Sequence, residues 1–101
     1  MWFVYIILCS DDTLYTGITN DVRRRFEQHA SGRGAKYFYG RRPQRIVYLE
    51  SGHDRSSATQ RELRLKKLNR QQKTLLIASD CNRIDDLLIG STAQQAVEDH
   101  A

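Results

Sequence analysis

Two tyrosines and a glycine occur where a β-hairpin would bring them together. Tyr5 lies in the apolar run 2–8, and Tyr15 and Gly17 lie in the run 13–17. Successive side chains of a strand point to opposite faces, so Tyr15 and Gly17 share a face. If the hairpin loop has three residues, Tyr5 faces Gly17 and Tyr15 is its diagonal neighbour. Gly17 would then leave open space beside two phenol hydroxyls, although packing tyrosines are also common in sheets.

A helix expected after this hairpin carries two further side chains that could do chemistry. At about 100° per residue, Arg25 and His29 project on the same side, beside the apolar stripe of Val22 and Phe26. A guanidinium at the edge of a buried face can hold a phosphate with two hydrogen bonds. The sequence leaves alternatives open: for Arg25, a carboxylate partner or a stem that packs on the apolar surface while its charge stays in water, and for His29, a surface or boundary position.

One carboxylate falls within the apolar stripe of a later helix. Glu62 is the only acidic residue between positions 55 and 73, and it shares a helix face with Ala58, Leu65 and Asn69. A carboxylate is seldom buried unless it is paired or binds a metal. An ion pair with Lys66, four residues further on, would explain the position as well as a metal site would.

Three segments are predicted to be strands, because they are short, apolar and rich in β-branched or aromatic residues. They cover residues 2–8, 13–17 and 46–50. The first two are expected to form an antiparallel hairpin around residues 10–12. Residues 32–44 contain three glycines and the only proline, which indicates an irregular segment, and residues 51–54 predict a turn.

Helices are predicted over roughly residues 21–30, 56–68 and 70–78. Asn20 is the expected N-cap of the first helix. Ser57 and Gln60 have capping-box spacing in the second helix, and Asn69 repeats that spacing with the glutamine three residues on, which indicates a break into the third helix.

The element order is therefore β-β-α-β-α-α, which predicts an α+β domain in which helices pack against a three-stranded sheet. The length of 101 residues suits one domain. We assign residues 1–79 to this domain and residues 80–101 to an acidic C-terminal tail of net charge −4, with one weak helical pattern over 84–89.

The positive charge is concentrated in the middle of the chain. Residues 20–50 have a net charge of +5 and residues 55–73 a net charge of +6. This distribution suits a polyanionic partner, because phosphate binding releases condensed counterions. A generic basic surface is the alternative.

The location is expected to be cytoplasmic, without a membrane partner. The longest apolar run, residues 2–9, is far shorter than a membrane span, and the N-terminus lacks the pattern of a signal peptide. Cys9 and Cys81 are expected to be reduced packing residues.

The residues that could do chemistry also spell a known family pattern. Phe3-Val4-Tyr5, Tyr15-Thr16-Gly17, Arg25, His29 and Glu62, in this order and spacing, resemble the GIY-YIG nuclease superfamily. The closest likeness is to small stand-alone bacterial proteins of this domain, the UPF0213-like group, over roughly residues 2–78. The resemblance implies a three-stranded antiparallel sheet flanked by helices, and hydrolysis of DNA with Mg²⁺ or Mn²⁺. Phe3 and Thr16 depart from the family's usual Gly and Ile.

The resemblance also implies a role for each residue. Glu62 would bind the metal, together with water and phosphate oxygens. Arg25 would neutralise charge on the scissile phosphate. Tyr5 would help to deprotonate the attacking water, with His29 taking the proton onward. Tyr15 would orient the water or a phosphate oxygen.

DNA is the implied partner, with branched or damaged DNA and a link to repair or recombination as the implied context. We expect DNA contacts from Gly17, Arg33, Lys36, Arg41, Arg42, Lys66 and Lys67. Asn69 is a candidate for an asparagine that many members carry after the metal-binding helix, although its spacing from Glu62 is short. The alternative is a non-catalytic nucleic-acid-binding module that retains the nuclease fold.

Overall fold

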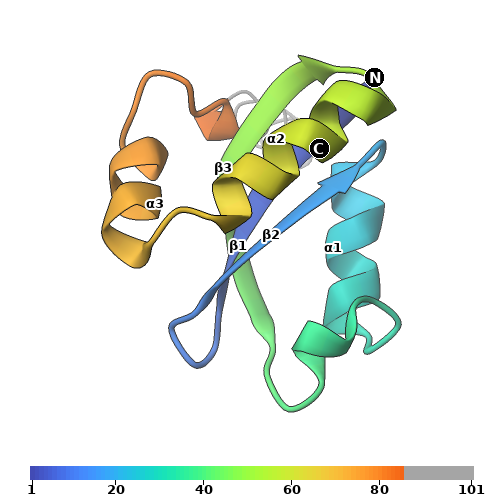
Figure 1. The fold of residues 1–101 in the computed structure, drawn as a ribbon. Coiled ribbons are helices and arrows are strands. Elements are labelled where there is room, and N and C mark those ends of the chain that lie inside the picture. Colours follow the sequence, from blue (N-terminus) through green and yellow to red (C-terminus); the bar gives the residue numbers. More distant parts are fainter. Residues whose placement is uncertain (86–101) are drawn as a thin grey trace, which may run out of the picture.

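The computed structural model describes residues 1–85 of the chain (Figure 1). The elements are β1 (Trp2–Cys9), β2 (Leu14–Thr19), α1 (Val22–Ala30), the 3₁₀ helix η1 (Lys36–Phe38), β3 (Pro43–His53), α2 (Arg55–Lys66) and α3 (Arg70–Ile77). The predicted order β-β-α-β-α-α and the α+β class are confirmed. Residues 86–101, which include most of the predicted acidic tail and of its helical pattern, lie outside the described residues.

The sheet has the strand order β2-β1-β3, and both pairings are antiparallel. The central strand β1 is buried on both faces, as predicted. On one face, Tyr5 and Ile7 pack with Val22 of α1 and with Phe38 of η1. On the other face lies a second cluster, made by Val4, Ile6, Tyr48, Ala58 and Leu65. Helix α2 lies across this second face in Figure 1, so α1 and α2 cover opposite faces of the sheet.

The hairpin has the predicted register. Tyr5 pairs with Gly17, and Ile7 pairs with Tyr15. The amide of Cys9 donates to the carbonyl of Thr13 at 2.9 Å, which closes a three-residue loop. Tyr15 is therefore the diagonal neighbour of Tyr5 on the face that α1 covers.

Two predicted helix starts are wrong by one to three residues. The N-cap of α1 is Asp21 rather than Asn20, because the Asp21 carboxylate accepts a hydrogen bond from the Arg24 amide. The capping box of α2 joins the N-cap Asp54 to Ser57 at position N3, so Ser57 is the last residue of the box rather than its first. The predicted capping box of Asn69 with Gln72 is confirmed at the start of α3.

The predicted turn at residues 51–54 is wrong over residues 51–53. Strand β3 continues to His53, which pairs with Trp2 at the start of β1. A register shift between Trp2 and Val4 and a positive φ of 81° at Gly52 accommodate this extension. The turn-forming residues are thus held in the sheet by their partner strand.

Residues beyond α3 contact the outer edge of β3. The Asn82 side chain accepts from the Leu49 amide at 3.1 Å and donates to the Val47 carbonyl at 2.8 Å. The Arg83 amide donates to the Leu49 carbonyl at 2.7 Å. These bonds satisfy backbone groups that an edge strand would otherwise leave open. The domain boundary at residue 79 stays a prediction.

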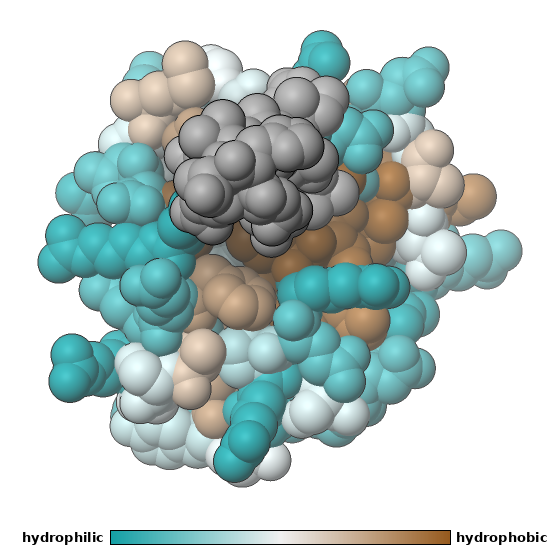
Figure 2. All heavy atoms as spheres, turned by 180° about the vertical axis from the view of Figure 1, so that it is seen from behind, coloured by the Kyte–Doolittle hydropathy of each residue, from teal (hydrophilic) through white to brown (hydrophobic). Residues whose placement is uncertain are grey.

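The face of the molecule seen from behind in Figure 2 is mostly hydrophilic, with apolar side chains near its centre and at its sides. Across residues 1–85, no helix combines the length and the apolar character that a membrane crossing requires.

Candidate active site

The Tyr5 hydroxyl lies directly over Gly17. A Cβ atom at position 17 would lie 2.5 Å from the Tyr5 hydroxyl oxygen and 3.2 Å from the Tyr15 ring. Tyr5 is 2% exposed, and its hydroxyl forms a hydrogen bond of 2.8 Å with Nε2 of His29. A side chain at position 17 would therefore clash with the Tyr5 hydroxyl, so glycine is required there. The open space that the sequence predicted above Gly17 is filled by Tyr5 itself.

His29 is buried in the last turn of α1, with 1% exposure, and its ring is held from both sides. Its Nε2 contacts Tyr5, and its Nδ1 accepts the amide N–H of Ala35 at 3.4 Å. Burial, together with the charge of Arg25, lowers the pKa of His29 to about 4. The imidazole is thus neutral at neutral pH, and the surface alternative for His29 is wrong.

An aromatic cluster surrounds the two tyrosines. The Tyr15 ring lies 5.3 Å from the His29 ring, 4.9 Å from Phe38 and 5.0 Å from Tyr37, measured between centroids. Phe38 and Tyr37 come from η1, inside the segment predicted to be irregular. Sequence reasoning missed these packing residues, since the segment shows neither a helical nor a strand period.

Arg25 is half-buried beside the tyrosine pair, and its Nη1 donates to Gln28 at 3.0 Å. None of the carboxylates in residues 1–85 lies within ion-pair distance of it, so the alternative of a paired Arg25 is not realised there. Burial, and next the neighbouring Tyr15, raise the pKa of Tyr5, while a hydrogen bond from Arg25 and its charge act to lower it.

Glu62 lies in the buried stripe of α2, as predicted. Ala58 and Leu65 are 0% and 1% exposed, and the Glu62 side chain is 17% exposed. Nζ of Lys66 lies 3.6 Å from one carboxylate oxygen, so the predicted ion pair is present. The charge of Glu62 also acts to raise the pKa of both Tyr5 and Tyr15. The carboxylate therefore contributes to the same electrostatic environment as Arg25.

The donor set suits a hydrated divalent cation. In the described part of the chain, no three His, Cys, Asp or Glu side chains gather as a metal cluster. A structural metal with a full set of protein ligands is thus not supported by these residues. Mg²⁺ keeps several waters and is commonly held by one or two carboxylates plus substrate phosphates. Glu62, which is partly exposed and whose charge acts on both tyrosines, fits this pattern.

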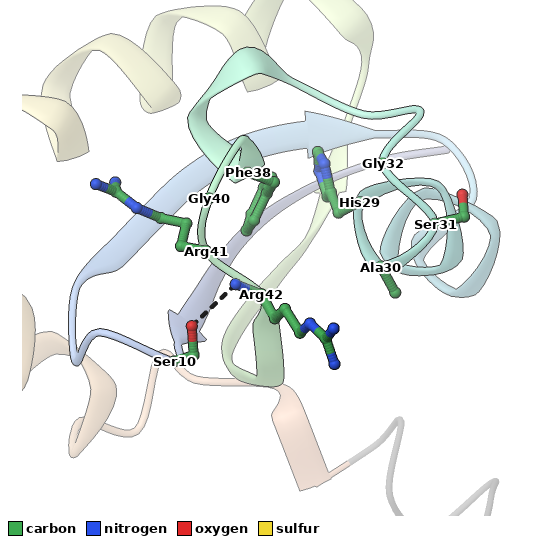
Figure 3. Close-up of a pocket in the computed structure, with 9 residues that line it drawn as sticks. All are labelled: Ser10, His29, Ala30, Ser31, Gly32, Phe38, Gly40, Arg41 and Arg42. Carbon is green, nitrogen blue, oxygen red and sulfur yellow. Dashed lines mark hydrogen bonds between the residues drawn. The ribbon is translucent and has the colours of Figure 1, made fainter.

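Two of the predicted DNA contacts line a pocket of about 510 Å³ (Figure 3). Arg41 and Arg42 form part of its wall, together with His29 and Phe38. The Arg41 guanidinium is 3.0 Å from the carboxylate of Asp11 and lies over the Tyr37 ring. The two arginines thus lie next to the aromatic cluster of the candidate site.

The other predicted DNA contacts are distributed over the surface. Arg33, Lys36 and Lys67 are exposed, and Lys66 is engaged with Glu62. Asn69 is exposed too, and its side chain accepts the Gln72 amide at 2.8 Å as the N-cap of α3. This capping contact accounts for Asn69 structurally.

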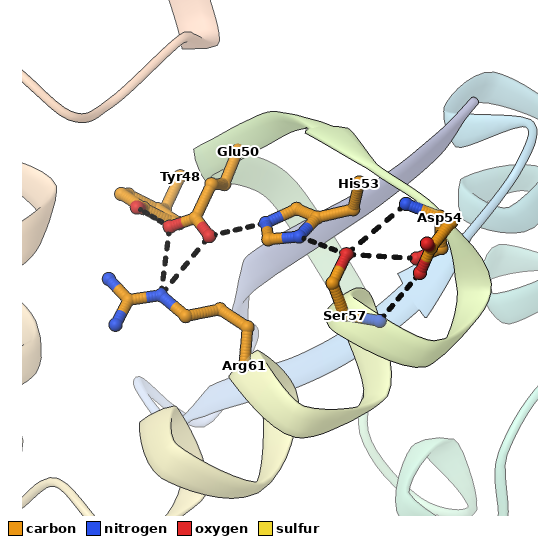
Figure 4. Close-up of polar contacts among 6 residues, drawn as sticks. All are labelled: Tyr48, Glu50, His53, Asp54, Ser57 and Arg61. Atoms are coloured by element: carbon orange, nitrogen blue, oxygen red, sulfur yellow. Dashed lines mark hydrogen bonds and ion pairs between the residues drawn. The ribbon is translucent and has the colours of Figure 1, made fainter.

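A polar cluster fastens α2 to β3 (Figure 4). The Glu50 carboxylate of β3 accepts hydrogen bonds from Tyr48 at 2.6 Å, from His53 at 2.6 Å and from Arg61 at 3.0 Å. Nδ1 of His53 lies 2.9 Å from the hydroxyl of Ser57 in the first turn of α2. Arg61 precedes Glu62, so this cluster fixes the helix that presents the carboxylate.

Comparisons with known proteins identify the family and the fold. A family model described as the GIY-YIG catalytic domain matches residues 1–75. A UPF0213 protein of Desulfotalea psychrophila is 48% identical over 77 residues, which cover 75% of this chain and 70% of the relative. A UPF0213 protein of Escherichia coli is 47% identical over 77 residues, 76% of this chain and 77% of the relative.

One solved structure is also similar. The solution NMR structure of a UPF0213 protein from Bacillus halodurans is 39% identical, with a TM-score of 0.52. The match covers 86% of this chain and 94% of that chain. The likeness extends to the three-stranded antiparallel sheet with its helices.

Proposed function

The chain belongs to the GIY-YIG catalytic domain family, and from that premise we propose that it is a divalent-metal-dependent endonuclease that hydrolyses phosphodiester bonds in DNA. The observation that carries the proposal is electrostatic. The charges of Arg25 and Glu62 both act on the hydroxyl of Tyr5, which rests on Gly17. A cation, a carboxylate and a phenol that share one site are the groups that phosphodiester hydrolysis needs.

Arg25 supplies the fixed positive charge. It is half-buried and without a carboxylate partner in residues 1–85, so its guanidinium can bind a phosphate oxygen without first breaking an ion pair. Negative charge builds up on the phosphate oxygens in the transition state, and a preorganised guanidinium stabilises that charge.

Tyr5 is the candidate general base, and Tyr15 the candidate orienting group. A buried phenol holds its proton tightly, because burial disfavours the phenolate. The hydrogen bond from Arg25 opposes that effect at Tyr5. Tyr15, whose pKa burial also raises, lies diagonally beside Tyr5 and can hold a water or a phosphate oxygen by hydrogen bonding.

Glu62 would hold the divalent cation, Mg²⁺ or Mn²⁺. When bound, such a cation supplies positive charge to phosphate oxygens and lowers the pKa of a coordinated water. Glu62 can take this role because its carboxylate is partly exposed and is contacted by Lys66 at one oxygen only. The Lys66 ammonium, half exposed, is free to move to a phosphate once the cation is in place.

The basic surface is proposed to bind the DNA strand on either side of the site. The exposed cations Arg33, Lys36, Arg42 and Lys67 suit contacts to the phosphate backbone. Such contacts carry no base sequence information, so a substrate defined by structure, such as branched or damaged DNA met in repair or recombination, fits better than a sequence-specific site. The cytoplasm is the proposed location.

A non-catalytic nucleic-acid-binding module is the second candidate, favoured by the ion pair that Lys66 makes with Glu62. A nicking assay on supercoiled and branched DNA with Mg²⁺ or Mn²⁺ separates the two. The endonuclease proposal expects cleavage by the wild type and none by Glu62→Ala, with DNA binding retained in both. If both proteins bind DNA and neither cuts it, the binding module is the better account.

A further inference from the structure

The two ring nitrogens of His29 have different partners. Nε2 lies 2.8 Å from the hydroxyl oxygen of Tyr5, and Nδ1 accepts the amide N–H of Ala35 at 3.4 Å. A backbone amide can only donate, whereas a phenol hydroxyl can donate or accept. The Ala35 contact is therefore the one that decides how the ring is protonated.

A neutral imidazole carries one proton, so the nitrogen that accepts cannot also donate. With Nδ1 accepting from Ala35, the proton resides on Nε2, and Nε2–H donates to the Tyr5 oxygen. We propose that the loop residues Gly34 and Ala35 are positioning residues that fix His29 as the Nε2–H tautomer, so that His29 donates to Tyr5 and does not accept its proton. This inference rests on the proposed nuclease function of the site.

The low pKa of His29, about 4, supports a neutral ring at neutral pH. Burial is the main cause, and the charge of Arg25 adds to it. The charge of Arg25 also acts on the Tyr5 hydroxyl. The oxygen thus faces the imidazole donor and a neighbouring positive charge, which together stabilise a phenolate. The phenol proton is therefore not directed at His29. His29 is then not the proton relay that the family resemblance implies.

Gly34 makes the contact possible. A Cβ atom at position 34 would lie 2.0 Å from Nδ1 and 2.9 Å from Cα of His29, so a larger residue would force the ring or the loop to move. The glycine lets the backbone approach the imidazole closely enough for the next amide to reach Nδ1.

The backbone angle at Ala35 allows its amide N–H to be removed by a proline substitution. Its φ of −65° is the value that proline imposes, and its N–H donates to Nδ1 of His29. Proline also restricts the preceding residue, and Gly34 lacks the Cβ atom that causes part of this restriction. Ala35→Pro therefore deletes the donor and places its Cδ atom where the amide hydrogen faced Nδ1, so the imidazole loses this hydrogen bond and must shift. Ala35→Ser is the matched control, since it changes the side chain and keeps the N–H.

The first measurement is the tautomer of His29 in the full chain, by ¹⁵N NMR of the imidazole at pH 7.5. The expected wild-type spectrum has a protonated Nε2 and an unprotonated Nδ1, and Ala35→Ser retains it. In Ala35→Pro the two tautomers should mix. A wild-type ring protonated at Nδ1 overturns the inference, whether or not the protein cuts DNA, and this result requires no variant to fold.

The second measurement is steady-state cleavage of DNA by the same three proteins with Mg²⁺. Ala35→Pro is expected to lower kcat at least tenfold with KM unchanged within about twofold, and Ala35→Ser to match the wild type. Equal kcat values in Ala35→Pro and the wild type, with a mixed tautomer, would contradict the positioning role. An inactive wild type with the expected tautomer would count against the nuclease proposal and leave the tautomer assignment standing.

Discussion

At the scale of single residues, the site combines groups whose protonation is set by burial and by close neighbours. Tyr5 is almost fully buried, which raises its pKa, yet it faces Arg25 and His29. His29 is neutral because the same burial disfavours its charged form. The buried pair is costly to charge, so any phenolate at Tyr5 depends on the cations around it.

Arg25→Ala is expected to lower kcat by about 10²–10³-fold, as loss of a preorganised charge donor does, and to affect DNA binding much less. Steady-state cleavage and a binding titration check both parts. Arg24→Ala, one position away and exposed, is the control and should behave as the wild type. Loss of the circular dichroism signal in Arg25→Ala would show instead that Arg25 holds the fold.

The stability of the protein should fall as the pH falls from about 6.5 toward 4. Folded His29 has a pKa of about 4, below the usual value of about 6.5. As the pH falls, the unfolded chain therefore binds a proton at His29 before the folded chain does, and this proton binding stabilises the unfolded state. The free energy of unfolding should lose up to about 1.4 kcal/mol per pH unit in this window.

Urea unfolding between pH 5 and pH 7 measures this slope. His29→Gln removes the titrating ring, so its slope should be flatter than that of the wild type. Equal slopes in the two proteins would mean that His29 is not the neutral buried group described above.

The sequence predicted the positions of single residues correctly where apolar side chains repeat at the spacing of a helix or a strand. The spacing of Glu62 with Ala58 and Leu65 located a carboxylate in a buried stripe. The contacts of His29 with Gly34 and Ala35 could not be predicted, because they join the end of a helix to a loop without a period. The glycine-rich composition of that loop was the only available signal.

At the scale of elements, the position of Glu62 depends on how α2 is joined to the sheet. Glu50 is the central acceptor of the polar cluster that joins α2 to β3. Burial alone would raise the pKa of Glu50, but hydrogen bonds from Tyr48, His53 and Arg61 hold it below its usual value. Glu50 is thus an ionised carboxylate with its partners in place, and it holds the helix that carries Glu62.

Glu50→Ala is expected to destabilise the fold by about 2–3 kcal/mol, because it leaves the partly exposed Arg61 charge and two polar side chains without their acceptor. Tyr48→Phe removes one donor only and should cost about 1 kcal/mol. Chemical denaturation of both variants tests this order. A smaller loss of unfolding free energy in Glu50→Ala than in Tyr48→Phe would show that the Glu50 cluster does not hold α2.

The elements themselves were largely predictable. The hairpin register follows from strand alternation and a common loop length, and it alone brings Tyr5 over Gly17. The end of β3 was not predictable, since residues 51–53 have turn composition and are held extended by pairing with β1. The strand order was also beyond the sequence, because it depends on contacts between distant segments.

At the scale of the whole molecule, the charge distribution determines what the domain can bind. Residues 20–50 and 55–73 carry net charges of +5 and +6, and many of their basic side chains are exposed. A DNA strand is the natural partner of such a surface, because each neutralised phosphate releases counterions.

DNA affinity should therefore fall steeply with salt. The slope of log K against log salt concentration is expected to be about −0.9 for each phosphate contacted. Lys67→Ala, at an exposed position beyond α2, should reduce the slope by about one contact without changing the fold. Fluorescence anisotropy over a range of salt concentrations gives both values. A flat response in the wild type would remove the polyanion argument.

The most direct test of the central claim is the single-turnover rate of DNA cleavage as Mg²⁺ is added and then chelated. The account predicts no cleavage without a divalent cation, saturating cleavage with it, and loss of cleavage in Glu62→Gln, which keeps the shape of the side chain and removes its charge. Cleavage that persists in the chelated wild type, or equally in Glu62→Gln with Mg²⁺, would contradict the assignment of Glu62 as the metal-binding residue of a nuclease.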